Sequence, residues 1–499
     1  MKVVNIMNFV RAVEPRATID LMTPVVEEIK LNKKYGFENT FLLQYDTMLS
    51  QDFVDLFQKE KDEKMELGIW IEMAKPLIEK IGVEWRGRKN WEWDYHVNPG
   101  FLPAYTKEQR EKIIDEIMEK FKSLFGYYPK TAGSWVLDSY SVNYMTENYK
   151  LDAFCICREQ WGSDGFTIWG GYYNGPYYPS KNNILNPAQN SEMQISSPMI
   201  KILGPDPIYC YHERFKEKYN KMSETLYTLE PTWHCGQNEK WVRWYFKNLL
   251  ENEDLGYSYT QTGQENPFGW KNIKKGLPMQ FEIISELQEK GLIKVEKMCD
   301  TGKYFKEKYK ETPPTAYSAL DDWAEMGNKS VWYSCKNYRI NIFNDDEEVS
   351  IRDIHKFDEN YVDQYLDNPC KEACCIYDSL PVIDSVRFSD DNTKCGIYFG
   401  KGEIEKIEKV NANDLMVYVT VENKQIKILL SEEGISIECN QDFVAEFKFK
   451  ENTNQIKNID EHEIKYEHNE MNYSMKLSCG SIENNSFISD NGVIKIELI

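Results

Sequence analysis

Short apolar runs alternate with amphipathic helical segments through the first two thirds of the chain. Residues 3–10 form a strand-like run, and Thr23-Pro24 then predicts a helix that is capped by threonine and begins with proline. Thr106 and Gln109 form a capping box for a helix that ends at Gly126. Because strand–helix–strand units build parallel sheets, we predict an α/β fold with a seven-stranded parallel (β/α) barrel. Further strands are expected at 40–45, 67–71, 131–137, 151–157, 226–229, 256–261, 293–297 and 317–320.

The pattern changes at about Lys329, where apolar residues begin to alternate with period two. Segments 338–343, 415–420 and 425–430 show this alternation, and turns rich in Asn, Asp and Gly separate them. Such a pattern predicts an antiparallel β domain of the sandwich type. At 499 residues the chain exceeds the size of one hydrophobic core. We therefore expect a barrel domain over 1–328 and a β-rich domain over 329–499.

The net charge and the distribution of apolar residues limit the kinds of partner that the protein is expected to bind. The net charge of −21 argues against nucleic acid, because phosphate binding depends on clustered Lys and Arg. No apolar run reaches the length of a membrane span, so no membrane partner is expected. The first residues enter strand-like sequence at once, and most of the twelve cysteines are scattered through apolar strands. These features predict a cytoplasmic bacterial protein with reduced thiols and no cofactor.

Acidic residues follow the ends of several predicted strands. Parallel barrels bind ligands at the carboxyl ends of their strands, where the connecting loops converge. Some of these acids would also serve as N-caps of the next helix. A series of acids on one face of a barrel is better explained as a binding site. The residues are Asp46, Glu72, Asp138, Glu230, Glu265, Asp321 and Asp322.

Aromatic residues crowd the loops after the third and fifth predicted strands. A sugar offers apolar C–H faces to rings and hydroxyls to carboxylates, so this mixture suits a carbohydrate. The alternative is that the rings only hold long loops onto the barrel. Two carboxylates on opposite sides of a glycosidic bond are the minimum equipment for its hydrolysis. The expected sugar contacts are Trp93, Trp135, Trp161, Trp169 and Trp270, together with Asp46, Glu72, Asp94, His96, Glu230 and Asp321.

Segments 33–42 and 125–135 resemble steps in the barrel of the glycoside hydrolase and polysaccharide deacetylase superfamily. Gly133-Ser134-Trp135-Val136-Leu137-Asp138 is similar to the Gly-x-Trp-x-x-Glu motif of glycoside hydrolase family 57, which implies that Asp138 is the nucleophile. Gln264-Glu265-Asn266-Pro267-Phe268-Gly269-Trp270 resembles the family's acid/base segment, which implies that role for Glu265. The family's histidine-rich first motif has no counterpart at 8–11. As a whole, the chain resembles an uncharacterised gut-bacterial family with a glycoside hydrolase/deacetylase-like barrel.

The resemblance implies a glycoside hydrolase that cleaves an oligosaccharide or glycoconjugate without a metal ion. One alternative is a metal-dependent carbohydrate deacetylase, which needs one Asp and two His as ligands. Asp94 and His96 supply part of such a set, although the Thr-Phe-Asp-Asp motif expected at the first strand is absent. Another alternative is a non-catalytic sugar-binding barrel. The missing histidines favour it, whereas the retained acids count against it.

Overall fold

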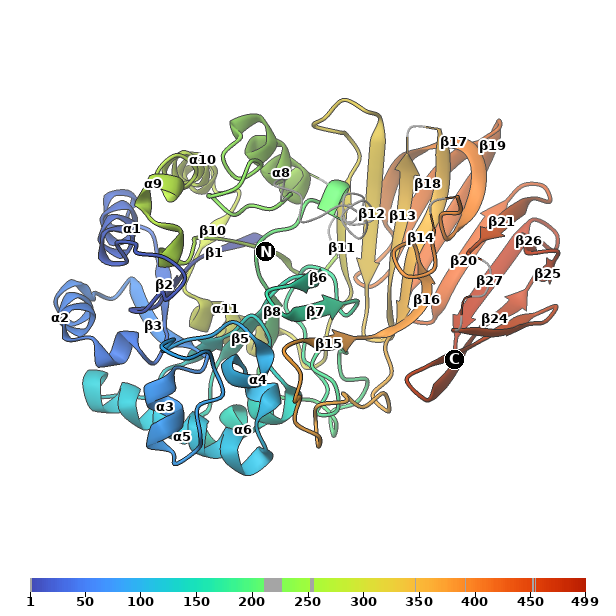
Figure 1. Ribbon diagram of the computed structural model, residues 1–499. Helices are drawn as coiled ribbons and strands as arrows, with labels where there is room; N and C mark the ends of the chain where they lie inside the picture. Colours follow the sequence, from blue (N-terminus) through green and yellow to red (C-terminus); the bar gives the residue numbers. More distant parts are fainter. Residues whose placement is uncertain are drawn as a thin grey trace.

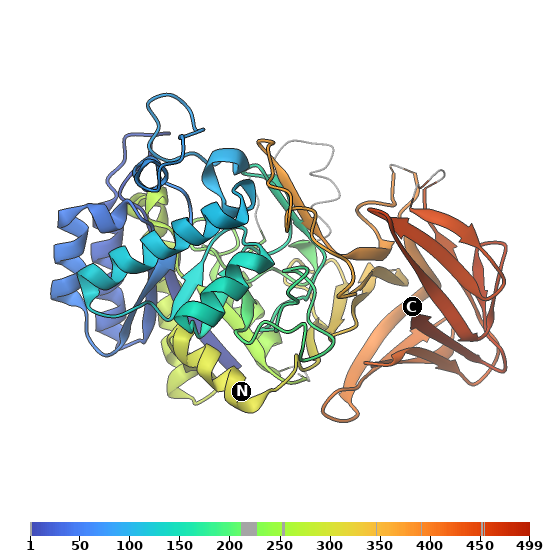
Figure 2. The same cartoon turned by 90° about the horizontal axis from the view of Figure 1, so that it is seen from below.

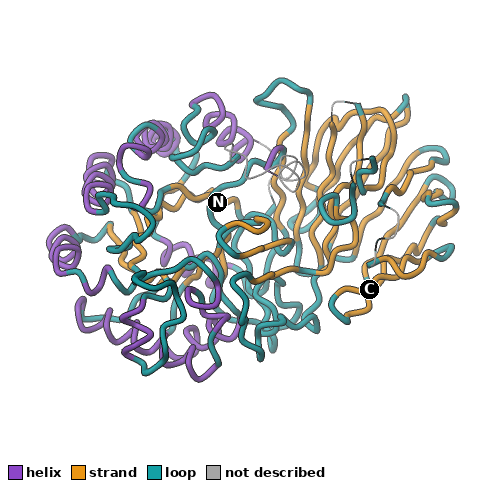
Figure 3. Tube along the Cα trace, viewed as in Figure 1, coloured by secondary structure: helices purple, strands orange, loops and turns teal. Residues whose placement is uncertain are grey.

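A computed structural model of the chain describes residues 2–210, 227–251, 255–345, 347–390, 392–450, 453 and 455–499. Figure 1 shows a barrel in the N-terminal half and a stack of antiparallel strands in the C-terminal half. The same division is visible in Figure 3, where the helices gather around the barrel. The predicted fold class is confirmed.

The barrel consists of parallel strands in the order β10-β1-β2-β3-β4-β5-β8, with β9 also paired to β1. Apart from β10, which is only two residues long, the barrel has the predicted number of seven strands in the part of the chain that the structure describes, although β8 was not among the predicted ones. The strand predicted at 317–320 pairs instead in the antiparallel half of the molecule. The described residues show no backbone pairing between β8 and β9, and Gln261 bridges there by accepting a hydrogen bond from the Leu203 amide at 3.0 Å. The barrel is therefore open along one side. The strands are β1 (Lys2–Val10), β2 (Asn39–Leu43), β3 (Met65–Trp70), β4 (Thr131–Gly133), β5 (Ala153–Ile156), β8 (Met199–Lys201), β9 (Ser258–Thr262) and β10 (Lys294–Val295).

The predicted strand at 226–229 begins at a position outside the described residues, and Thr228 forms only an isolated bridge with Pro205. The predicted cap at Thr23 was wrong. The helix starts at Met22, where the Asp20 carboxylate accepts hydrogen bonds from the Met22 and Thr23 amides, both at 3.0 Å.

Helices cover the outside of the barrel. The predicted capping box at Thr106 and Gln109 is confirmed, and Gly126 ends that helix in the left-handed conformation that glycine adopts at no steric cost. No helix among the described residues is both long and apolar enough to cross a membrane. The helices are α1 (Met22–Tyr35), α2 (Gln51–Glu60), α3 (Lys75–Lys80), α4 (Val97–Gly100), α5 (Lys107–Phe125), α6 (Ser139–Tyr149), α8 (Glu239–Glu251), α9 (Trp270–Ile273), α10 (Gly276–Glu289) and α11 (Met298–Lys308).

The C-terminal half forms two antiparallel layers joined through the long strand β17 (Gly396–Lys409). The first layer contains β11 (Thr315–Ala319), β12 (Asn328–Ser334), β13 (Tyr338–Asp345), β14 (Glu348–Lys356), β16 (Leu380–Asp384), β21 (Val444–Lys448), β25 (Ser481–Glu483) and β26 (Ser486–Ile488). The second contains β18 (Leu415–Val421), β19 (Lys424–Ser431), β20 (Gly434–Cys439), β22 (Ile456–Ile459), β23 (Glu463–His468), β24 (Met471–Cys479) and β27 (Val493–Leu498). Their inward residues share one hydrophobic core, as expected for a sandwich.

The strands β11 to β14 of the first layer are the part of the sandwich nearest to the barrel (Figures 1 and 2), whereas β21, β25 and β26 lie far from it (Figure 1). Successive residues of β12 point to opposite sides, so Val331 and Tyr333 join the sandwich core while Trp332 packs toward the barrel. Trp332 stacks on Tyr173 with a centroid distance of 4.0 Å. Because β11 already pairs with β12, the sheet begins before Lys329. The domain boundary at 328/329 stays a prediction.

One segment of the C-terminal half returns to the barrel. We call residues 359–378 the returning segment, which ends in β15 (Cys375–Asp378). β15 pairs in parallel with β7 (Phe166–Trp169), and β7 forms a hairpin with β6 (Gln160–Ser163). The Val97 amide also donates to the Ala373 carbonyl at 2.9 Å. The returning segment thus supports loops that surround the carboxyl ends of the barrel strands.

Candidate functional site

A buried arginine at the end of β1 gathers three acidic side chains. Arg11 Nη2 lies 2.8 Å from Glu265 Oε2 and 3.4 Å from Glu72 Oε2. Arg11 Nη1 lies 3.5 Å from Glu14 Oε2. These residues come from the loops after β1, β3 and β9, which meet because β1 lies between β2 and β9 in the sheet. We call Arg11, Glu14, Glu72 and Glu265 the Arg11 cluster.

Glu72 is fully buried and is held by donors on both oxygens. The Trp70 indole N–H donates to Oε1 at 2.9 Å, and the Trp93 indole N–H donates to Oε2. The ring of Trp93 also lies beside two guanidinium groups, with its centroid 4.1 Å from Arg11 and 4.8 Å from Arg16. Indole N–H groups and a guanidinium compensate the negative charge of a buried carboxylate. The arrangement suits a Glu72 side chain that acts as an anion.

Glu265 has different surroundings. Burial raises the pKa of its carboxyl to about 7, Arg11 opposes this shift and Glu72 adds to it. Oε2 makes the ion pair with Arg11 but accepts no hydrogen bond with favourable geometry from the described residues. A carboxyl that keeps its proton near neutral pH can donate that proton to a substrate. Glu265 therefore has the properties of a general acid.

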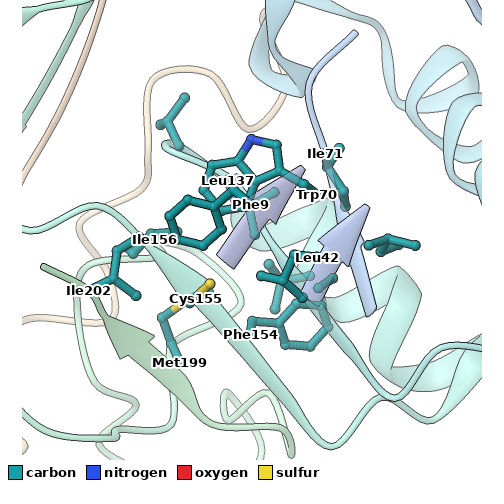
Figure 4. Close-up of a cluster of buried hydrophobic side chains, with 14 of the residues drawn as sticks. Phe9, Leu42, Trp70, Ile71, Leu137, Phe154, Cys155, Ile156, Met199 and Ile202 are labelled. Atoms are coloured by element: carbon teal, nitrogen blue, oxygen red, sulfur yellow. The ribbon is translucent and has the colours of Figure 1, made fainter. Parts of the chain in front are cut away.

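Aromatic rings form a surface beside the Arg11 cluster. Phe9 and Trp70 stack with a centroid distance of 4.1 Å, and Trp135 meets them edge-on at 5.6 and 5.1 Å. Figure 4 shows Phe9 and Trp70 together above the apolar side chains of the barrel interior. Phe9 and Trp70 are buried, whereas Trp135 is partly exposed. Trp135 is thus a ring that a ligand can reach.

Glu230 lies beyond the end of β8, in the gap between β8 and β9. Burial raises the pKa of its carboxyl, while the nearby Arg158 guanidinium opposes the shift. The Thr228 hydroxyl donates to Glu230 Oε2 at 2.9 Å. Trp161, on the β6–β7 hairpin, is 40% exposed. Both residues were predicted as sugar contacts, and both belong to loops at the carboxyl ends of the strands.

Asp46 and Asp138, which the strand-end pattern also singled out, have structural partners. Asp46 Oδ2 accepts hydrogen bonds from the Ala12 and Val13 amides at 2.9 and 2.8 Å, so it holds the loop that carries Arg11. Burial raises the pKa of its carboxyl to about 6.

Asp138 is the N-cap of α6. Its Oδ1 lies 2.9 Å from Arg110 Nη1 and accepts from the Ser141 amide at 2.9 Å, while Oδ2 accepts from the Ser141 hydroxyl at 2.7 Å. These partners lie on α5 and α6, so Asp138 contacts them rather than Glu265. The predicted catalytic pair is not brought into contact, and the nucleophile role of Asp138 stays a prediction.

Three other predicted sugar contacts bind neighbours outside the Arg11 cluster. The Trp169 indole donates to Asp384 at 3.0 Å in the first sandwich layer. Asp321 accepts from Asn248 of α8 at 2.9 Å. Trp270 begins α9 and packs against a hydrophobic cluster that includes residues of α8 and α10. Their roles in sugar binding remain predictions.

Asp94 and His96 do not fit the metal site that a deacetylase implies. Arg88 Nη2 lies 2.8 Å from His96 Nε2 and 3.1 Å from Nδ1, so a guanidinium stands where a cation would bind. The Arg88 amide donates to Asp94 at 3.0 Å. Over the described parts of the chain, no three His, Cys, Asp or Glu side chains are grouped to hold a metal ion.

Arg11, Trp70 and Arg158 were not predicted as site residues. Arg11 follows the first strand and Trp70 ends the third, so the strand-end rule that selected the acids applied to them as well. A search of strand ends for cations and indole donors would have found both.

No protein-family model and no curated protein matches the sequence. Among solved structures, a protein described as a glycoside hydrolase/deacetylase from Parabacteroides distasonis aligns with a TM-score of 0.54 and 14% identity, over 76% of this chain and 89% of that chain. Polysaccharide deacetylases from Mycobacterium smegmatis and Pseudomonas aeruginosa align with TM-scores of 0.36, at 10% and 11% identity. Each alignment covers 62% of this chain and 92% or 91% of the other. The first likeness supports the barrel fold, and the resemblance to family 57 motifs is not confirmed.

Proposed function

We propose that this protein is a carbohydrate-active hydrolase in which Glu265 donates a proton and Glu72 is the second carboxylate. One observation carries the proposal. Two buried glutamates share a single nitrogen of Arg11; burial raises the pKa of the Glu265 carboxyl to about 7, whereas Glu72 accepts hydrogen bonds from the indole N–H groups of Trp70 and Trp93. Two carboxyl groups with different surroundings are the arrangement needed for acid and nucleophile or base roles.

The reaction that this geometry supports is cleavage of a glycosidic bond. Glu265 protonates the leaving oxygen, and anionic Glu72 attacks the anomeric carbon or activates water. The two Oε2 atoms are no farther apart than the sum of their distances to Arg11 Nη2, 2.8 and 3.4 Å. This upper limit lies below the roughly 6.5–9.5 Å carboxyl separation of inverting enzymes and leaves room for the about 5–5.5 Å separation of retaining ones. We therefore expect retention of configuration.

The ring proposed to stack on the sugar is the partly exposed Trp135, while the buried Trp93 holds Glu72 through its indole N–H. Rings beside carboxylates suit the alternating apolar and hydroxyl faces of a pyranose. Oligosaccharides or glycoconjugates are the substrates that we propose. Asp138 is kept out of the reaction, because its hydrogen bonds to Arg110 and Ser141 already satisfy it as a helix cap.

The name of the Parabacteroides neighbour spans glycoside hydrolase and deacetylase. A deacetylase is therefore the second candidate, although the residues at Asp94 and His96 do not fit its metal. The two activities release different products from the same sugars, since one frees a reducing end and the other frees acetate.

A panel of native and acetylated oligosaccharides tests the proposal when both products are measured. The wild-type protein should release reducing ends, and Glu265→Gln should lower the rate by about 10²–10⁴-fold, the usual contribution of a general acid. Glu79→Gln, on the exposed face of α3, is the matched control and should keep full activity. Release of acetate without reducing ends would replace the hydrolase with the deacetylase. Binding seen in tryptophan fluorescence, without either product, would indicate a sugar-binding barrel.

A further inference from the structure

A cavity lies at the end of the barrel opposite the Arg11 cluster. Its volume is about 620 Å³, within the range of small-molecule sites. Its wall includes Lys130, just before β4, Asp152, just before β5, and Ser197, just before β8. These positions are the amino ends of parallel strands, whereas the Arg11 cluster follows their carboxyl ends. The cavity is therefore separate from the proposed catalytic site.

The charge of this cavity is opposite to that of the chain. Five lysines line it with a single carboxylate, Asp152, in a protein with a net charge of −21. We call it the lysine pocket. Its lysines are Lys130, Lys150, Lys303, Lys306 and Lys310.

Most of the positive charge in the lysine pocket is not neutralised by the protein. Lys306 pairs with Asp152 at 2.5 Å, and Lys303 lies 3.3 Å from Asp300. Among the described residues, the one hydrogen-bond acceptor of the Lys310 ammonium group is the Lys306 carbonyl, at 3.2 Å. Lys130 and Lys150 have no carboxylate within ion-pair distance in the described part of the chain. Placing like charges together costs free energy that a bound anion would recover.

Helix ends explain part of this arrangement. Lys306 lies in the last turn of α11, and Lys150 directly follows α6, where the partial negative charge of a helix C-terminus stabilises cations. That effect does not explain why lysines from three separate connections converge on one cavity. Lys130 follows α5 by several residues and Lys310 lies beyond the end of α11.

We propose that the lysine pocket binds a small organic phosphate that carries one or two phosphate groups. Lysine acts as a point charge for phosphate, and the lining contains no arginine of the kind that recognises carboxylates in pairs. The exposed Ser196 adds a hydroxyl donor. The partly exposed Tyr309 supplies apolar ring surface for the organic part of the ligand.

Calorimetry with the intact protein tests this site, with inorganic phosphate, pyrophosphate, a hexose phosphate and a nucleoside diphosphate as probes. Pyrophosphate should bind to one site per chain. The last two probes distinguish a sugar from a nucleotide as the organic part. Affinity should fall as salt rises, because the lysine head groups are solvated and their attraction is screened.

The double variant Lys130→Gln/Lys150→Gln should weaken pyrophosphate binding by roughly tenfold or more, since two charge-assisted contacts are lost. The matched control is Lys274→Gln/Lys275→Gln, two exposed lysines between α9 and α10, and it should bind as the wild type does. Thermal unfolding checks that both variants fold. Failure of all four probes to bind, or equal binding by the two double variants, would overturn the proposal. Binding of an acidic polypeptide with no binding of pyrophosphate would also overturn it.

Discussion

Two buried arginine–carboxylate groups of the barrel look alike in composition but differ in how completely they are satisfied. Arg110 donates to Asp138 and to the carbonyls of Leu102, Tyr105, Pro103 and Tyr365, and both Asp138 oxygens have partners. In the Arg11 cluster one arginine serves three glutamates, and Glu265 keeps an oxygen without a hydrogen bond from the described residues.

The difference separates a structural group from a candidate reactive one. A fully hydrogen-bonded buried ion pair holds α5, α6 and the returning segment in place. An incompletely satisfied carboxyl with a raised pKa can bind or protonate a substrate. Burial and charge are common to both groups, so neither alone identifies the site.

The largest expected effect concerns turnover. Glu265→Gln should lower the rate by about 10²–10⁴-fold, whereas Asp138→Asn should keep turnover within about tenfold, because asparagine remains a good N-cap. Rates on any substrate that the wild type cleaves measure both. A loss of several orders of magnitude in Asp138→Asn, with its fold intact, would return Asp138 to the mechanism as nucleophile.

The free energy of unfolding should depend most on the Arg110–Asp138 pair, the reverse of the order expected for turnover. Arg110→Met leaves the Asp138 charge buried and partly unpaired, which should cost about 3–5 kcal/mol. The double variant Arg110→Met/Asp138→Asn should recover part of this loss, since the uncompensated charge is removed. Urea unfolding gives the free energies. If Arg110→Met cost less than about 1 kcal/mol, the contrast between the two groups would not hold.

The contribution of Glu265 to the pH dependence of stability can be isolated by comparing the wild type with Glu265→Gln. Its folded pKa is about 7 against an ordinary value of 4.5, so between these values the folded protein holds more protons than the unfolded chain. Stability should therefore fall as pH rises from about 4.5 to 7, by up to about 3 kcal/mol from this group. Glu265→Gln should show a correspondingly smaller loss over that range. Parallel stability curves for the two proteins would contradict the raised pKa.

A smaller effect is expected from Trp135. Replacing this ring with alanine should weaken sugar binding by roughly tenfold, the scale of one aromatic contact. Trp161→Ala, on the β6–β7 hairpin, provides a comparison at a more exposed ring. Fluorescence titration with a cleavage-resistant oligosaccharide measures both. Unchanged affinity in Trp135→Ala would indicate that the sugar binds somewhere other than beside the Arg11 cluster.

The smallest expected effect is that of a chelator. Since the residues around Asp94 and His96 do not fit a metal site, incubation with EDTA should leave the rate and the melting temperature unchanged. Loss of activity that a divalent ion restores would favour the deacetylase instead.

Much of the architecture was predictable from the sequence, because strand–helix alternation and the change to period two after Lys329 are local signals. The capping box at Thr106 and the left-handed end at Gly126 followed from residue chemistry alone. The helix start near Thr23 was misplaced because Asp20 provides a competing cap, and acids and threonines cap almost equally well.

The site was only partly predictable. The strand-end rule selected Glu72 and Glu265, but it selected Asp138 by the same criterion, and a helix cap cannot be told from a ligand without its partners. Arg11 forms ion pairs with acids from the loops after β3 and β9. These contacts exist only in the folded barrel. The spacing of Arg11, Glu72 and Glu265 along the sequence does not indicate that the three side chains meet.

The parallel pairing of β15 with β7 has a consequence for synthesis of the chain. This pairing cannot form until the chain has been synthesised from Phe166 to Cys375, which at about 5–20 residues per second takes on the order of ten to forty seconds. During that interval the β6–β7 hairpin and the loop at Val97 lack the partners that later cover them. The nascent barrel thus carries uncovered strand edges at its mouth until the ribosome has passed β15, when only β11 to β14 of the sandwich strands have been made.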